Sequence, residues 1–101
     1  MVKHVTSVEE FEKEIKEGKV LVDFFATWCG PCKMLTPIIE KVAGEHPELK
    51  VLKIDVDEVG ELAARFEVQA IPTLLYFEDG EQKDRAMGYV PEVKLLSFVR
   101  L

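Results

Sequence analysis

The segment Trp28-Cys29-Gly30-Pro31-Cys32-Lys33 contains both cysteines of the 101-residue chain. It stands between an apolar run, residues 19–26, and a helical pattern that starts at Gly30-Pro31, since proline favours a first helical turn. Side chains three positions apart on a helix lie about 5–6 Å from each other. A disulfide needs Cα atoms about 4.4–6.8 Å apart, so the two thiols can pair and separate with little backbone movement. The spacing therefore predicts a redox-active pair rather than a structural cross-link.

Length and composition indicate one globular domain, residues 1–101, with one hydrophobic core. The net charge is −6 and the basic residues form no stripe, which argues against nucleic acids and anionic membranes as partners. No apolar run approaches the roughly 20 residues that span a bilayer. The first six residues do not resemble a signal peptide, so we expect a cytoplasmic protein.

Hydrophobic periodicity predicts strands alternating with helices, in the order β-α-β-α-β-α-β-β-α. The predicted strands are residues 2–5, 19–26, 51–56, 73–77 and 81–87, and the predicted helices begin after Ser7, at Gly30-Pro31, after Asp57 and at Pro91. The core face predicted for the second helix is Met34, Leu35, Ile38, Ile39 and Val42. This order predicts a sheet with helices on both faces, and chemistry usually lies where its strands end and helices begin.

The two cysteines are predicted to have different roles. Cys29 falls at the N-cap or first turn of its helix, where free N–H groups and the helix dipole stabilise a thiolate. Cys29 is therefore the candidate nucleophile, and Cys32, further along the helix, is the candidate resolving thiol. A zinc site is disfavoured because the sequence has no second cysteine pair, and neither His4 nor His46 has ligand spacing.

Three other residues near this segment have more than one interpretation. Asp23 interrupts the apolar run, where a buried carboxyl has a raised pKa and is a candidate acid/base for Cys32. Alternatively, its side chain reaches solvent or a backbone donor at the strand end. Pro72 marks the start of a strand, with a trans bond as the default. Trp28 fits either the core or an exposed flap beside the thiols.

Together these residues resemble the thioredoxin family. The resemblance is carried by Val22-Asp23-Phe24, Ala26 to Met34, Pro37, Ile71-Pro72-Thr73 and Gly88, and it extends over essentially the whole chain. It implies an α/β thioredoxin fold, a central mixed five-stranded sheet flanked by four helices in three layers. It also implies reduction of protein disulfides by a monomer that binds no cofactor or metal. Electrons would come from NADPH through a flavin-containing thioredoxin reductase.

The resemblance also assigns the site. Cys29 would be the exposed attacking cysteine, Cys32 the buried resolving cysteine, Asp23 the buried acid and Pro72 a cis-proline facing the disulfide, which replaces the trans default. A flat apolar surface would receive the substrate polypeptide; its residues would be Trp28, Gly30, Pro31, Ile71, Pro72 and Gly88.

Several positions depart from the common bacterial pattern of the family. Phe25 replaces a frequent Trp, Ala70 a frequent Gly, and Tyr89 a usually small residue at the rim of the binding surface. Val51 is assigned to the position where many members have a Lys near the buried Asp. Lys53, two residues on, would share that sheet face and partly substitute.

Two alternative functions follow from the same residues. One is a redox-dependent binding partner of a larger assembly that does not turn over, although the intact cysteine pair favours chemistry. The other is a disulfide oxidant or isomerase, which Gly30-Pro31 disfavours because it resembles the reducing members of the family.

Overall fold

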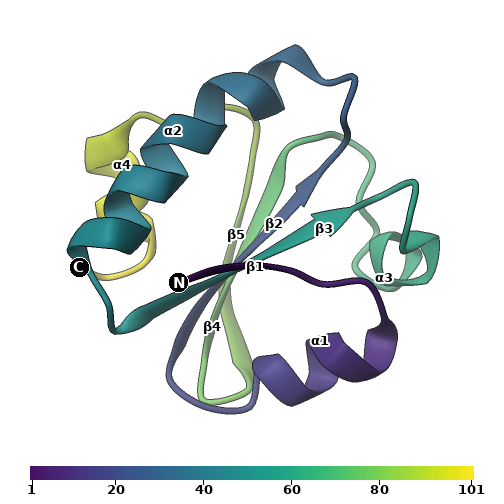
Figure 1. Cartoon of the computed structure of the whole chain (residues 1–101), viewed down its shortest axis with the longest axis horizontal. Helices are drawn as coiled ribbons and strands as arrows, with labels where there is room; N and C mark the ends of the chain where they lie inside the picture. Colours follow the sequence, from purple (N-terminus) through teal and green to yellow (C-terminus); the bar gives the residue numbers. More distant parts are fainter.

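A computed structural model describes all 101 residues (Figure 1). Its elements are β1 (Val2–His4), α1 (Val8–Glu14), β2 (Lys19–Phe25), α2 (Gly30–Glu45), β3 (Leu49–Asp55), α3 (Gly60–Arg65), β4 (Thr73–Glu78), β5 (Glu81–Met87) and α4 (Glu92–Phe98). Every predicted element is present, in the predicted order. None of the helices is long and apolar enough to cross a membrane.

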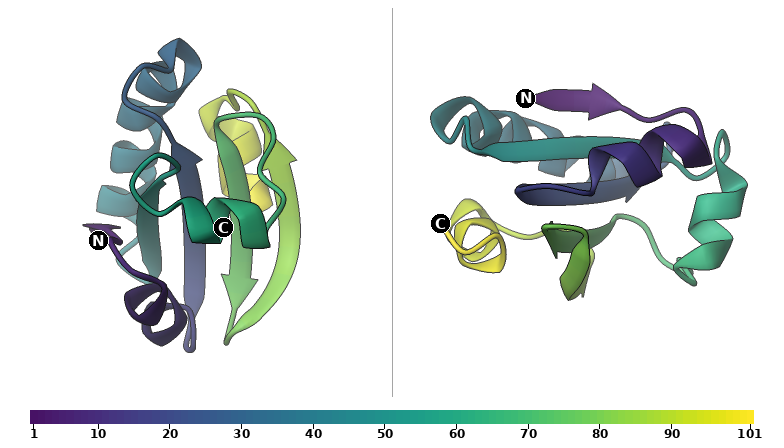
Figure 2. Two further views of the ribbon diagram at one scale, coloured as in Figure 1. Left: turned by 90° about the vertical axis from the view of Figure 1, so that its right-hand side faces the viewer. Right: turned by 90° about the horizontal axis from the view of Figure 1, so that it is seen from below.

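The five strands form one mixed sheet in the order β1-β3-β2-β4-β5. The strands β1, β3 and β2 are parallel, whereas β4 is antiparallel to both β2 and β5. Helices α1 and α3 cover one face and α2 and α4 the other, so the molecule has three layers (Figures 1 and 2). The expected five-stranded, four-helix architecture is confirmed, and β2 lies at its centre.

Each face of the sheet has its own apolar core. On the first face, Phe11 of α1 and Leu62 of α3 pack with Phe24 of β2. On the second face, Leu35 and Ile39 of α2 pack with strand residues and with α4. Because β2 contributes alternate side chains to both cores, its apolar residues form a nearly continuous run.

Helix α2 differs in one respect from its predicted core face. Leu35, Ile39 and Val42 are buried and Ile38 is partly buried, as predicted. Met34 instead is 62% exposed. It precedes Leu35 by one position and so lies about 100° away around the helix, beyond the edge of the buried stripe. The prediction that Met34 belongs to the core was wrong.

The ends of two other elements were also placed wrongly. Strand β3 begins at Leu49, two residues before the predicted start, because Leu49 is buried and continues the alternation. Asp57 does not cap α3; the N-cap residue is Val59 and it provides no side-chain hydrogen bond. Asp57 lies before the helix, in the loop at the carboxyl end of β3.

Candidate active site

The cysteine pair lies where β2 ends and α2 begins. Cys29 is the N-cap residue of α2, and its Sγ accepts a hydrogen bond from the backbone N–H of Cys32 at 3.2 Å. The two residues form a disulfide with Cα atoms 5.3 Å apart. A sulfur at this position accepts a hydrogen bond from an N–H group that the helix would otherwise leave unsatisfied. This hydrogen bond and the positive end of the helix dipole favour a thiolate at Cys29.

The two cysteines do not differ in overall exposure. Each is 5% exposed, so the implied contrast between an exposed and a buried cysteine is absent from this oxidised state. They differ in their neighbours instead. Cys29 follows the exposed Trp28, and its Sγ lies 3.8 Å from the carbonyl oxygen of Ile71, whereas Cys32 lies one turn inside the helix.

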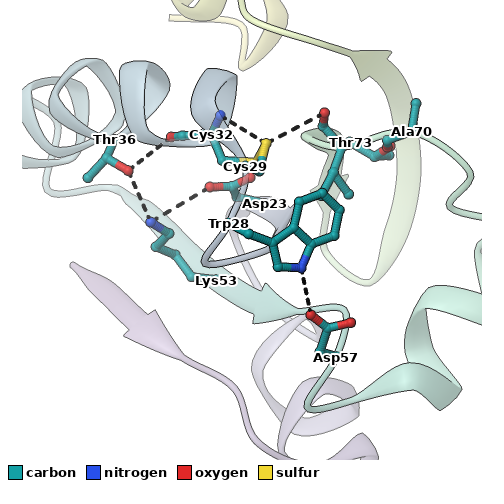
Figure 3. The surroundings of a disulfide bond; sticks show 10 residues. Asp23, Trp28, Cys29, Cys32, Thr36, Lys53, Asp57, Ala70 and Thr73 are labelled. Carbon is teal, nitrogen blue, oxygen red and sulfur yellow. Dashed lines mark hydrogen bonds and ion pairs between the residues drawn. A yellow bond between two sulfur atoms is a disulfide. The ribbon is translucent and has the colours of Figure 1, made fainter.

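Asp23 is a buried carboxyl group with few partners. The residue is 2% exposed, and its Oδ1 atom has no hydrogen-bond partner. Burial raises the pKa of Asp23 to about 6, while the positive charge of Lys53 acts in the opposite direction. The Lys53 Nζ atom lies 4.0 Å from Oδ2. Figure 3 shows the carboxylate pointing toward the region between Lys53 and the disulfide, so Asp23 is not the solvent-facing residue of the alternative interpretation.

The strand register corrects the placement of this lysine. Lys53 on β3 is the direct partner of Asp23 on β2, and Val51 instead pairs with Leu21. The assignment of Val51 to the position of the family's lysine was therefore displaced by two residues. Lys53 itself occupies the position beside the buried acid.

The strand β4 begins beside the disulfide. The Ile71–Pro72 peptide bond is cis, as the resemblance implied and contrary to the trans default. The carbonyl oxygen of Pro72 accepts a hydrogen bond from the backbone N–H of Gly88 at 2.8 Å. These contacts bring Ile71, Pro72 and Gly88 to the same end of the sheet as Cys29.

The predicted binding surface combines exposed and covered residues. Trp28 is 69% exposed, which excludes the interpretation as a core residue, and Gly30 and Pro31 are also exposed. Ile71 and Gly88 are partly buried and Pro72 is buried, so Pro72 has little accessible area in the predicted surface.

Sequence reasoning missed the partner of Trp28. Its indole Nε1–H donates to Asp57 Oδ2 at 3.0 Å, across the loop after β3 (Figure 3). Because β2 and β3 are parallel, the loops after their carboxyl ends meet at one edge of the sheet. An acidic residue in that loop was the available signal, but it was interpreted as a helix cap.

The remaining polar groups provide no metal site. No group of three or more His, Cys, Asp or Glu side chains is arranged to hold a metal ion.

Comparison with known proteins agrees with this geometry. The thioredoxin family model matches residues 2–101. The chain belongs to the thioredoxin family. The thioredoxin of Staphylococcus saprophyticus is 48% identical over 90 residues, which are 88% of this chain and 86% of the relative. That of Chlamydia trachomatis is 44% identical over 95 residues, 94% of this chain and 93% of the relative.

Solved thioredoxin structures have the same fold. Oxidised mitochondrial thioredoxin 3 of Saccharomyces cerevisiae superposes with a TM-score of 0.90 at 36% identity, covering 99% of this chain and 95% of the other. Fasciola hepatica thioredoxin superposes with a TM-score of 0.89 at 39% identity, covering 97% of this chain and 96% of the other. Family membership and the Cys29–Cys32 disulfide identify the chain as a thiol–disulfide oxidoreductase that reduces protein disulfides.

Proposed function

We propose that Cys29 is the attacking cysteine of this oxidoreductase and Cys32 the resolving one. The Cys29 thiolate attacks one sulfur of a substrate disulfide, which forms a mixed disulfide and releases the other sulfur as a thiolate. Cys32 then attacks the Cys29 sulfur, so the substrate is released with two thiols and Cys29–Cys32 is oxidised. The observation that carries this proposal is the N-cap position of Cys29, where the Cys32 N–H points at its sulfur.

Asp23 is proposed to accept the proton that Cys32 loses when it attacks. A carboxyl group with a pKa of about 6 is mostly ionised at pH 7, so it can accept a proton and return it near neutral pH. Asp23 lies in β2, two residues before that strand ends, and is only 2% exposed, so bulk water has little access to its carboxyl group.

The substrate is proposed to bind as an extended segment beside Ile71 and Pro72, with Trp28, Gly30, Pro31 and Gly88 around it. The backbone N–H of Ile71 has no hydrogen-bond partner within the chain, and its carbonyl contacts only the Cys29 sulfur. An extended polypeptide can pair with such free backbone groups.

We further propose that a flavin-containing thioredoxin reductase, supplied by NADPH, regenerates the dithiol. The chain itself would act in the cytoplasm as a monomer and as one domain, residues 1–101. Family membership supports the reductase and the disulfide-containing substrate proteins as general classes of partner.

Insulin reduction tests the function directly. With dithiothreitol as the electron source, the wild-type protein should accelerate reduction of the insulin disulfides, and a Cys29→Ser, Cys32→Ser double variant should not. A wild-type rate equal to the uncatalysed background would contradict the proposal. A reduction potential of about −120 mV, typical of strong disulfide oxidants, would instead indicate that the protein forms disulfides in its substrates.

A further inference from the structure

A single hydroxyl group connects the helix of the cysteines with the lysine beside Asp23. Thr36 lies one turn after Cys32 on α2, and its Oγ1 donates a hydrogen bond to the Cys32 carbonyl at 3.1 Å. The same Oγ1 accepts a hydrogen bond from Lys53 Nζ at 3.4 Å. A hydroxyl group can donate one bond and accept another, so both contacts exist together (Figure 3).

The Lys53 ammonium has few other partners. Its side chain is 13% exposed, and Nζ lies 4.7 Å from the centre of the Phe25 ring and 4.0 Å from Asp23 Oδ2. The Thr36 hydroxyl is its only hydrogen-bond partner in the chain. A mostly buried ammonium depends on such acceptors, because each N–H group that is removed from water without a partner costs free energy.

We propose that Thr36 is a positioning residue for disulfide exchange, because its hydroxyl holds the Lys53 ammonium beside the Asp23 carboxylate. The inference rests on the role proposed above for Asp23 in accepting the Cys32 proton. Without the hydroxyl, Lys53 would meet an apolar group on α2 and turn toward solvent. Asp23 would then lose part of its only neighbouring positive charge and bind its proton more tightly.

The surroundings of Asp23 leave few other groups that could produce this effect. Lys53 faces it from β3 and the cysteine pair from α2, while its partner on β4 is the apolar Leu74. His4 on β1 is the strand partner of Lys53 on the side of β3 that faces away from β2. In the oxidised protein the cysteines do not titrate, so the Asp23 titration can be followed without them.

The first test measures the Asp23 pKa in the oxidised protein, by the pH dependence of the carbon-13 chemical shift of its carboxyl group. Thr36→Val removes the hydroxyl at nearly constant volume and should raise the pKa by about 0.5 or more. Thr36→Ser keeps the hydroxyl and should retain the wild-type value. An unchanged or lowered pKa in Thr36→Val would overturn the proposal.

A double-mutant cycle tests whether the effect passes through the lysine. In a Lys53→Met background, Thr36→Val should produce no further change in the Asp23 pKa. If the full shift persists without Lys53, Thr36 acts by another route and the inference is wrong.

Rapid-mixing kinetics separate this inference from the proposed role of Asp23. Resolution of a preformed mixed disulfide by Cys32 should be about twofold slower at pH 6 in Thr36→Val, and the midpoint of its pH profile should move upward, with recovery in Thr36→Ser. Asp23→Asn is measured beside it. If Asp23→Asn resolves at the wild-type rate while Thr36→Val still shifts the carboxyl titration, the positioning stands and the catalytic role of Asp23 fails.

Discussion

Asp23 is the residue at which stability and chemistry conflict. Its carboxyl group lies in the central strand with one oxygen unpaired, and its lysine partner lies 4.0 Å away. A charge in such a place is poorly solvated, which is why burial raises its pKa to about 6. The same property lets the group exchange a proton near neutral pH. We therefore expect the folded protein to be less stable than it would be without this charge.

Replacing Asp23 by Asn should stabilise the protein in a pH-dependent manner. The folded-state pKa of about 6 lies above the ordinary value of 3.8, so the wild type is penalised fully above pH 6 and not at all below about pH 4. Asp23→Asn should raise the free energy of unfolding above pH 6 by at most about 3 kcal/mol. Urea unfolding at pH 4 and pH 8 measures this. An equal effect at both pH values would contradict it, and the exposed Asp84→Asn is the control.

At the scale of residues, the sequence predicted what depends on local spacing. The pairing of Cys29 with Cys32 follows from positions three apart at a helix start. The contact of Asp23 with Lys53 depends on the register between two strands, which the sequence pattern leaves open, and the lysine position was misplaced by two residues. Thr36 could have been found, because a residue four positions after Cys32 lies on the same side of the helix.

At the scale of elements, a network of charges fastens α1 to two strands. Glu14 of α1 accepts hydrogen bonds from Lys3 of β1 at 2.6 Å and from Lys50 of β3 at 2.8 Å. These bonds, with that from Lys3 the largest cause, hold the pKa of Glu14 at about 2, below its ordinary 4.5. The stabilisation is complete above about pH 4.5 and is lost as pH falls toward 2.

Glu14→Gln should therefore lower the melting temperature at pH 7, and the difference from wild type should shrink as the pH falls from 4.5 to 2. Calorimetry across this range measures it. Glu12→Gln is the control, because Glu12 makes only one exposed ion pair, with Arg65, and should change the melting temperature little. A Glu14→Gln effect that is independent of pH would show that the network contributes through packing alone.

The hairpin between β4 and β5 depends on a turn with positive φ angles. Asp79 and Gly80 have φ angles of 49° and 86°, as in the turns that match strand twist. Gly80→Ala should reduce stability by about 1 kcal/mol, since alanine is strained there. Gly44→Ala, in α2 with open space around the added Cβ, should increase stability by about 0.5–1 kcal/mol. Chemical denaturation measures both changes in the free energy of unfolding. Changes of the same sign for the two variants would contradict this account.

At the scale of the whole molecule, the fold assembles the site from distant segments. The adjacent strands β3, β2 and β4 bring Lys53, Asp23 and the start of β4 to one end of the sheet, where α2 begins. Apolar residues spaced three to four apart predicted the helices, and a continuous apolar run predicted β2, because burial on one or both faces leaves such patterns. The Asp79-Gly80 turn signal predicted β5. The family resemblance implied a mixed five-stranded sheet, but the order of the strands within it was not predicted, since periodicity within a strand does not specify its neighbours. Met34 and Asp57 were misjudged because helix edges and loops carry no such pattern.

The division of roles between the two cysteines is the central claim, and capture of the mixed disulfide tests it most directly. Single-cysteine variants are incubated with insulin, and covalent adducts are located by mass spectrometry. Cys32→Ser should accumulate a stable adduct on Cys29, because the resolving thiol is absent, and Cys29→Ser should form none. An adduct on Cys32 in the Cys29→Ser protein, with none on Cys29 in Cys32→Ser, would reverse the assignment and contradict the account.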